Sequence, residues 1–495
     1  MKNIFFIIIA LVIITPSRVQ ATELTHVAGA PFIWEKEKQT PFGFKLNLGF
    51  NYEYMSANIS REWQGDGALK VVRDLEYKRS TTTVNVGAEI GVKGFAFFLN
   101  LPIILSQSYK YSLVPGALYP GYPDYDACIA RNPTNPAACN PDGVNLHNSR
   151  TVQDGIVSDI YDPADVESIV PFAGGNAGPR TIMDGSRKGI DQLHVGFRFN
   201  VPVFNNVEDH TKPFWVLSFD VGLPVGTVMD FKRLHDGSPQ CGSVACSSGT
   251  QRPDLNTAVG RGVYDITLSS IMSNKRGIFD NFFKVWATLP FAYDNESLYR
   301  DKYYFANWGM KKPAAPIKGG ISFGTDFLVY NDPIKKIRLN LFVRGDVKGV
   351  FQGQDYSEAY ELLAGSPALY GPDTWAANGL PSSQYNDLAN INYYPGLTTV
   401  ENYAVLGGQI GMNLRITRYF FAEFSYGLRH MTEHFLTYTD AGIDDGTAAN
   451  TYGRIDLNTQ EANPYYRPVI DQVGNRYRIQ ESMIHTLMFK LYLLY

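Results

Sequence analysis

Apolar and polar residues alternate along much of this chain with a period of two, which is typical of a β-strand with one apolar face. The clearest stretch has apolar residues at every second position, namely Phe42, Phe44, Leu46, Leu48, Phe50, Tyr52 and Tyr54, with Gly43, Lys45, Asn47, Gly49, Asn51 and Glu53 between them. At about 3.3 Å per residue, such a stretch can cross a bilayer with the usual tilt. The pattern therefore predicts a membrane-spanning strand.

The same alternation recurs in twelve stretches, which are joined alternately by short turns and by long excursions. The short turns fall near Lys93-Gly94, Asn205-Asn206, Lys275-Arg276-Gly277, Asn331-Asp332-Pro333 and Thr417-Arg418. The long excursions lie near residues 56–81, 107–187, 227–262, 294–316, 350–401 and 433–478. Short turns on one side and long loops on the other are typical of an outer-membrane barrel. We predict an all-β fold, a transmembrane antiparallel β-barrel of about 12 strands over residues 42–495.

The barrel is expected to close because every backbone N–H and C=O in hydrocarbon must be paired. An even strand count places both termini and the short turns in the periplasm, and the long loops outside the cell. The excursions are rich in Pro, Gly, Asn and Asp, with a short helix expected at 357–363. The excursion at 107–187 is long enough to fold inward as a constriction.

The N-terminus resembles an export signal. Lys2 is followed by an apolar run over residues 4–14, and Val19-Gln20-Ala21 has the small–x–small form of a cleavage site. The run is too short for a membrane-spanning helix, which needs about 20 apolar residues. We predict a cleaved signal peptide at 1–21, then a periplasmic segment at 22–41, and hence the outer membrane of a diderm bacterium as the location.

Composition agrees with a barrel more than with a water-soluble enzyme, although the mean hydropathy of −0.17 alone would suggest a soluble protein. The chain has 31 Tyr, 30 Phe and 45 Gly, which suits long strands and aromatic belts at membrane interfaces. Its net charge of −4 does not indicate nucleic-acid binding.

The four cysteines form two close pairs in sequence, Cys128 with Cys139 and Cys241 with Cys246. In an exported chain such pairs predict two local disulfides that hold loops. A metal site is the alternative, but no histidine or further cysteine stands at ligand spacing beside either pair. We therefore predict disulfides, no metal and no cofactor.

The C-terminus resembles that of bacterial outer-membrane β-barrel proteins. It carries Phe489, Leu491, Leu493 and a terminal Tyr495 at alternate positions. This resemblance implies recognition by the barrel-assembly machinery, with outer-membrane lipid as the surroundings of the folded protein.

A narrower resemblance involves three segments, Gly189-Ile190-Asp191-Gln192-Leu193, Leu223-Pro224-Val225-Gly226 and Gly260-Arg261-Gly262-Val263-Tyr264-Asp265. They resemble segments of outer-membrane transporters linked to phenol and aromatic degradation, which are related to the long-chain fatty-acid channels. The similarity extends over about residues 189–330. The fatty-acid channels differ in having an N-terminal hatch and more strands.

If the apolar residues face lipid, the alternate positions face the lumen. They collect charged residues of both signs: Lys45, Glu53, Glu89, His194, Arg198, Asp220, Asp265, Lys284, Lys318, Asp326, Arg338, Arg344, Asp346, Arg415, Glu423, Arg429 and Lys490. They either line a water-accessible passage that selects solutes or fill a narrow barrel with ion pairs.

Four aromatic residues, Phe98, Phe282, Trp286 and Phe342, share this inward parity. They either form an apolar patch for hydrophobic solutes, pack against an inserted loop, or mark a register change at a bulge.

Catalytic motifs are weak. His147 stands near Ser149, but in a Pro/Asn-rich loop, and Arg429-His430 with His434 lies where a strand ends rather than on a helix. We predict no enzyme. The favoured function is an outer-membrane channel or facilitator for passive passage of small molecules, with hydrophobic or aromatic solutes as candidates. The alternative is a surface-displayed barrel that presents disulfide-pinned loops for interaction.

Overall fold

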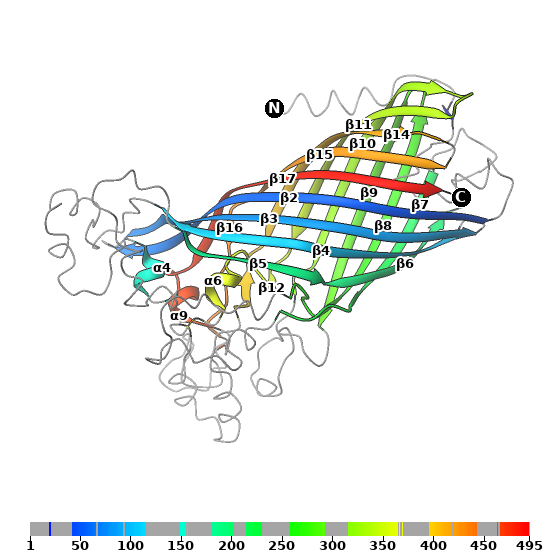
Figure 1. Ribbon diagram of the computed structural model, residues 1–495. Helices are drawn as coiled ribbons and strands as arrows, with labels where there is room; N and C mark the ends of the chain where they lie inside the picture. Colours follow the sequence, from blue (N-terminus) through cyan, green and yellow to red (C-terminus); the bar gives the residue numbers. More distant parts are fainter. Residues whose placement is uncertain are drawn as a thin grey trace.

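The fold is known from a computed structural model (Figure 1). It describes residues 19–20, 42–65, 68–92, 95–114, 149–154, 156, 181–201, 214–229, 258–292, 315–364, 366, 369, 396–417, 419–442, 463 and 466–494. The predicted periplasmic segment, all four cysteines and Tyr495 lie outside these residues. Within them, no helix is long and apolar enough to cross a membrane.

Antiparallel strands form a closed barrel of twelve wall strands, which confirms the predicted fold class. The wall consists of β2 (Phe42–Gly65), β3 (Ala68–Val92), β4 (Phe95–Leu113), β5 (Thr181–Ile190) with β6 (Gln192–Asn200) as one interrupted strand, β7 (Phe214–Pro224), β8 (Val263–Arg276), β9 (Phe279–Ala292), β10 (Lys318–Asp332), β11 (Ile337–Val350), β14 (Tyr403–Arg415), β15 (Phe420–Met431) and β17 (Tyr477–Leu494).

Short elements complete the fold. They are the strands β1 (Val19–Gln20), β12 (Gly353–Asp355), β13 (Thr398–Val400) and β16 (His434–Phe435), and the helices α4 (Arg150–Gln153), α6 (Tyr360–Leu363) and α9 (Pro468–Asp471). α6 forms within the helix predicted at 357–363. β2 and β3 continue as a paired hairpin through the predicted excursion 56–81, and in Figure 1 the tip of this hairpin extends past the ends of β4 and β17.

Closure follows from the strand pairing. β2 pairs with β17, which joins the two ends of the wall, and β8 pairs with β9. The apolar residues of the alternation point outward and stay exposed, for example Leu48 at 50% and Phe97 at 64%. Lys45, on the opposite parity, is buried inside. An apolar exterior on a closed hydrogen-bonded wall is the arrangement that lipid requires, so the chain is a transmembrane barrel.

Candidate functional site: the charged lumen and its cap

The interior has two zones. One lies toward the short turns and consists of charged side chains of the strands. The other lies toward the long loops and consists of apolar side chains and returning loop segments.

The first zone is a belt of ion pairs, here called the charged belt. Cross-strand partners Lys45 and Glu89 lie 3.8 Å apart (Nζ to Oε2), and Arg198 donates to the other oxygen of Glu89 at 2.7 Å. On the neighbouring strands, Lys490 and Arg344 both approach Oε1 of Glu423, at 3.7 and 3.6 Å. The belt therefore runs over seven wall strands and has these members: Lys45, Glu89, Arg198, Asp326, Arg344, Glu423 and Lys490.

The belt is layered. The side chains of Glu423 and Glu89 are only 1% and 3% exposed, whereas those of Lys490 and Arg198 are 32% and 24% exposed. The carboxylates thus lie against the wall, and the cations cover them on the side of the lumen. Water reaches Lys490 and Arg198, whereas it hardly reaches the two acids or Lys45, whose side chain is 7% exposed.

Aromatic rings lie beneath several of these cations. The guanidinium of Arg344 stands 3.6 Å from the ring centre of Phe342, and that of Arg198 stands 4.7 Å from that of Phe98. Phe342 in turn lies over Gly411, where a Cβ atom would overlap its ring. Phe282 lies over Gly324 and under Arg344 in the same way. Because Gly411 and Gly324 have no side chain, the rings of Phe342 and Phe282 can lie close against the wall.

This packing argues against the apolar patch, which is one of three alternatives for these rings. Phe282 and Phe342 are buried, at 7% and 1% exposure, because arginine covers them. They do not mark a bulge, since β9 and β11 keep their register at these positions. Trp286, which lies over Gly320, and Phe98 stay partly exposed.

The remaining predicted lumen residues also occupy inward register positions. His194 Nδ1 lies 3.1 Å from Asp220 Oδ2, Arg429 lies 3.6 Å from Asp346, and Glu53 accepts from Arg79 at 3.3 Å. Asp265 accepts from Arg261 at 2.6 Å. Arg338 and Arg415 are direct cross-strand partners near the short turns, and Lys284 faces Ile271 on the neighbouring strand.

The three segments that resemble aromatic-compound transporters meet at the interruption between β5 and β6. Arg261 donates to Asp191 at 2.9 Å, Gln192 donates to Asp265 at 3.0 Å, and the Gly226 amide donates to the Asp191 carbonyl at 3.2 Å. A polar cluster thus fills the break in the wall strand.

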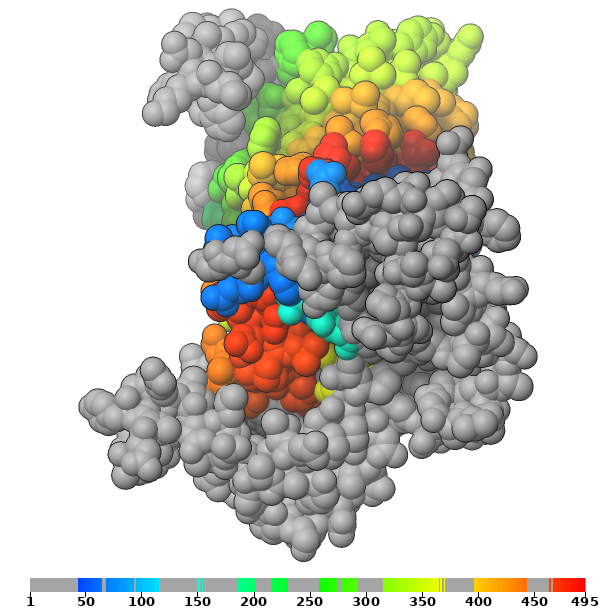
Figure 2. Space-filling view, turned by 90° about the vertical axis from the view of Figure 1, so that its left-hand side faces the viewer, coloured from blue at the N-terminus to red at the C-terminus, as the bar shows by residue number. Residues whose placement is uncertain are grey.

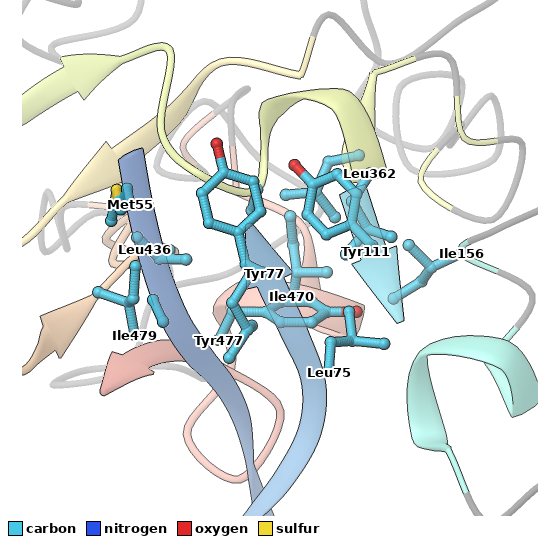
Figure 3. Close-up of a cluster of buried hydrophobic side chains, with 14 of the residues drawn as sticks. Met55, Leu75, Tyr77, Tyr111, Ile156, Leu362, Leu436, Ile470, Tyr477 and Ile479 are labelled. Atoms are coloured by element: carbon cyan, nitrogen blue, oxygen red, sulfur yellow. The ribbon is translucent and has the colours of Figure 1, made fainter. Parts of the chain in front are cut away.

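The second zone, here called the cap, is an apolar core formed where β2, β3, β4 and β17 continue past the barrel (Figure 3). The strands contribute Met55, Ile59, Leu75, Tyr77, Tyr111, Tyr477 and Ile479, and the returning segments contribute Ile156, Leu362, Leu363, Leu436 and Ile470. In Figure 2, which faces this end, the residues around α9 (red) and α4 (cyan) lie against the blue β2–β3 hairpin.

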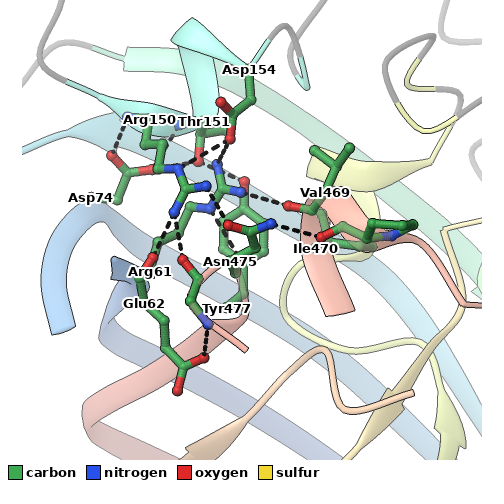
Figure 4. A network of polar contacts seen from close by, with 12 residues as sticks. Arg61, Glu62, Asp74, Arg150, Thr151, Asp154, Val469, Ile470, Asn475 and Tyr477 are labelled. Carbon is green, nitrogen blue, oxygen red and sulfur yellow. Dashed lines mark hydrogen bonds and ion pairs between the residues drawn. The ribbon is translucent and has the colours of Figure 1, made fainter. Parts of the chain in front are cut away.

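A buried polar network holds α4 and α9 to the hairpin (Figure 4). Arg61, with no exposed surface, donates to Asp154 at 2.7 Å and to the Val469 carbonyl at 2.8 Å, and stacks on Tyr477. Asp74 accepts from the amides of Arg150 and Thr151, both at 3.1 Å. Because each of these polar groups has a partner, their burial is tolerated.

One returning segment, residues 355–364, crosses the lumen and is here called the crossing segment. At one end Asp355 lies 3.8 Å from Lys318 of β10. At the other end Glu361 forms a two-bond ion pair with Arg187 of β5, and Tyr111 of β4 donates to the Glu358 carbonyl at 2.5 Å. β10 and β4 lie on nearly opposite sides of the barrel. The inward-folding segment therefore comes from the excursion at 350–401. Of the excursion at 107–187, residues 149–154 and 156 join the cap beside β2 and β3, and residues 115–148 and 157–180 lie outside the described residues.

The sequence analysis missed Arg79, Arg187, Arg261, Glu358 and Glu361. Arg79 and Arg187 lie within or at the border of stretches assigned to loops, and the two glutamates lie in the crossing segment. A signal did exist. Beyond Tyr54 the alternation changes phase, so that Met55, Ala57 and Ile59 are apolar on the inward parity. This change marks the point where β2 leaves lipid and begins to face an internal core.

The structure contains no group of three or more metal-type ligands among the described residues. His430 points outward from β15, opposite the exposed Leu406, and His434 stacks on Tyr403 at 4.0 Å. The two histidines therefore do not converge.

No family model and no curated protein matches the chain. Among solved structures it is similar to an outer membrane channel from Pseudomonas putida F1 (TM-score 0.37, 8% identity, 91% of this chain and 95% of that one). It is also similar to the outer membrane protease OmpT from Escherichia coli (0.26, 7%, 92% and 98%) and to a Pseudomonas aeruginosa FadL homologue (0.31, 8%, 92% and 90%). At these TM-scores the similarities assign no function. By its own architecture, a closed wall with an apolar exterior and a charged interior, the chain is an outer-membrane β-barrel.

Proposed function

We propose that this protein is a gated channel for passive passage of small molecules across the outer membrane. The observation that supports this most directly is the crossing segment, which spans a charged lumen and is held at both ends by ion pairs. A barrel that served only as a display platform would not need a water-accessible charged interior. A removable segment across such an interior suits a gate.

The holding contacts suit a gate because they differ in strength. The Arg187–Glu361 pair is buried and has two hydrogen bonds, whereas Lys318 and Asp355 are partly exposed and 3.8 Å apart. A buried pair that loses one partner leaves an uncompensated charge, which is strongly destabilising. The Glu361 end therefore controls how firmly the crossing segment stays in place.

Single-channel recording in planar bilayers tests the proposal with Glu361→Gln. We expect the variant to open more often than the wild type, because Arg187 loses its charged partner. Glu481→Gln is the matched control, since it breaks an exposed ion pair with Arg73 at the same end of the barrel. Its openings should equal those of the wild type.

A silent wild type together with a silent Glu361→Gln variant would contradict the channel. That outcome would favour the alternative, in which the barrel presents its loops to partners. The nature of the solute is a separate question, which the layering of the charged belt addresses.

A further inference from the structure

We infer that the lumen selects small anions, with organic carboxylates as the substrate class, because the charged belt exposes Arg198 and Lys490 and hides its carboxylates. This inference rests on the proposed channel and adds the sign of the charge that it accepts. It follows from three observations on the half of the lumen toward the short turns.

The first observation is the layering. Each belt carboxylate is nearly inaccessible, with Glu89, Asp326 and Glu423 at 1–3% side-chain exposure. Arg198 at 24% and Lys490 at 32% form the surface that a solute would meet, whereas Arg344 at 13% and Lys45 at 7% lie deeper. A solute in the lumen therefore lies closer to the positive charges than to the acids behind them, and the nearer charges dominate.

The second observation is the excess of cations. In this half of the lumen the described inward-facing cations are Lys45, Arg198, Lys284, Arg338, Arg344, Arg415 and Lys490. The described inward carboxylates are fewer, namely Glu89, Asp220, Asp280, Asp326 and Glu423. Four of them are buried, and Asp220, at 24% side-chain exposure, lies 3.1 Å from His194. Low-dielectric walls strengthen the field of this excess within the lumen.

The third observation is the contrast with the half toward the long loops. There the carboxylates are accessible, with Asp346 at 30% and Glu53 at 23% side-chain exposure, and each faces an arginine of similar exposure. That half presents both signs equally. The sign preference therefore belongs to the charged belt, where it would act as the selective step of the passage.

The aromatic rings under the cations agree with an anionic solute more than with an apolar one. Phe98, Phe282 and Phe342 are covered by Arg198 and Arg344. An apolar molecule would have to displace these guanidinium groups to reach the rings, whereas a carboxylate would meet the guanidinium groups directly.

The reversal potential across a potassium chloride gradient tests the inference. We expect a chloride preference for the Glu361→Gln channel. Adding Lys490→Gln should lower the chloride-to-potassium permeability ratio roughly two- to threefold, from the loss of one nearby charge in screened water. Lys284→Gln, on the far wall, should shift the ratio in the same direction. Lys335→Gln, in the exposed turn at the same end, should not.

A cation preference, or equal shifts for Lys490→Gln and Lys335→Gln, would overturn the inference while leaving the channel intact. If no conductance is seen, the channel itself fails, and chloride binding to the purified barrel then decides the inference. We expect ³⁵Cl NMR line broadening that Lys490→Gln reduces and that acetate reverses. Line broadening that changes neither with Lys490→Gln nor on addition of acetate would overturn the anion site.

Discussion

β2 passes through two environments, and its two parts show how one strand serves two kinds of packing. From Phe42 to Tyr54 its apolar side chains face lipid and its polar side chains face the charged belt. From Met55 to Ile59 the apolar side chains face inward and join the cap. The strand keeps its register with β3 throughout this stretch, so only the residue types change. Apolar side chains of β2 face lipid within the membrane. Beyond the membrane they face the interior, where the cap buries them.

The two zones are stabilised differently as a result. The charged belt consists of side chains on the hydrogen-bonded wall strands, together with aromatic rings that lie over glycines. Among the described residues, no loop residue takes part in it. The cap consists of segments that are remote in sequence, such as Arg61, Asp154 and Val469, and depends on a buried polar network. We expect the cap to open without unfolding the barrel, since regions of a protein can open locally below the global unfolding free energy.

The largest effect is expected for Arg61→Met in the cap. Loss of the buried guanidinium removes the hydrogen bonds that Arg61 donates to Asp154 and to the Val469 carbonyl. It should destabilise the cap by about 3 kcal/mol. Amide hydrogen exchange over residues 466–480 measures this, and the wall strands should stay protected.

Arg73→Met is the matched control, because Arg73 lies on the same hairpin in an exposed ion pair with Glu481. Exposed pairs contribute little. If Arg61→Met lowered the protection of β9 and β10 as much as that of residues 466–480, the two zones would form one cooperative unit and the comparison would fail.

The sequence predicts the charged belt better than the cap, because wall strands form the belt and segments remote in sequence form the cap. Period-two parity places Lys45, Glu89 and Glu423 inside because membrane strands have only two faces. The sequence does not reveal that the carboxylates lie behind the cations, since this depends on side-chain length and on which neighbours are glycine. The cap is harder still, because contacts such as Arg187 with Glu361 join residues far apart in the chain.

A smaller effect is expected from pH at Asp471 in α9. Burial raises the pKa of this carboxyl to about 7, although the amides of Arg467 and Thr439 donate to it. Because its pKa in the closed cap lies above that of an open chain, the cap binds this proton more tightly. Stability from this group is complete below about pH 4 and is lost as the pH rises through about 7.

Between pH 5 and pH 8 the cap should lose about 2 kcal/mol, seen as faster hydrogen exchange over residues 466–475 at the higher pH after correction for the intrinsic rate. Asp471→Asn should abolish most of this dependence, because the amide keeps an acceptor and cannot ionise. A pH dependence that persists in Asp471→Asn would assign it to another group.

The smallest effect concerns the zone near the short turns. At Gly411 a new Cβ atom would overlap the ring of Phe342 and the carbonyl of Phe424. Gly411→Ala should therefore push Phe342 off the wall, disturb Arg344 above it and destabilise the barrel by about 1–2 kcal/mol. The measurement is the thermal unfolding midpoint of the barrel in detergent, and the cap should keep its hydrogen-exchange protection.

Gly49→Ala gives the matched comparison, since Gly49 also faces inward but its nearest neighbours stand 3.5 Å from the position of a Cβ atom, which is ordinary contact. Its unfolding midpoint should equal that of the wild type, because β2 has room for a methyl group there. If the two variants unfolded alike, the flat packing of rings over glycine would contribute nothing measurable. The charged belt would then depend on its ion pairs alone, and the anion preference should survive Gly411→Ala unchanged.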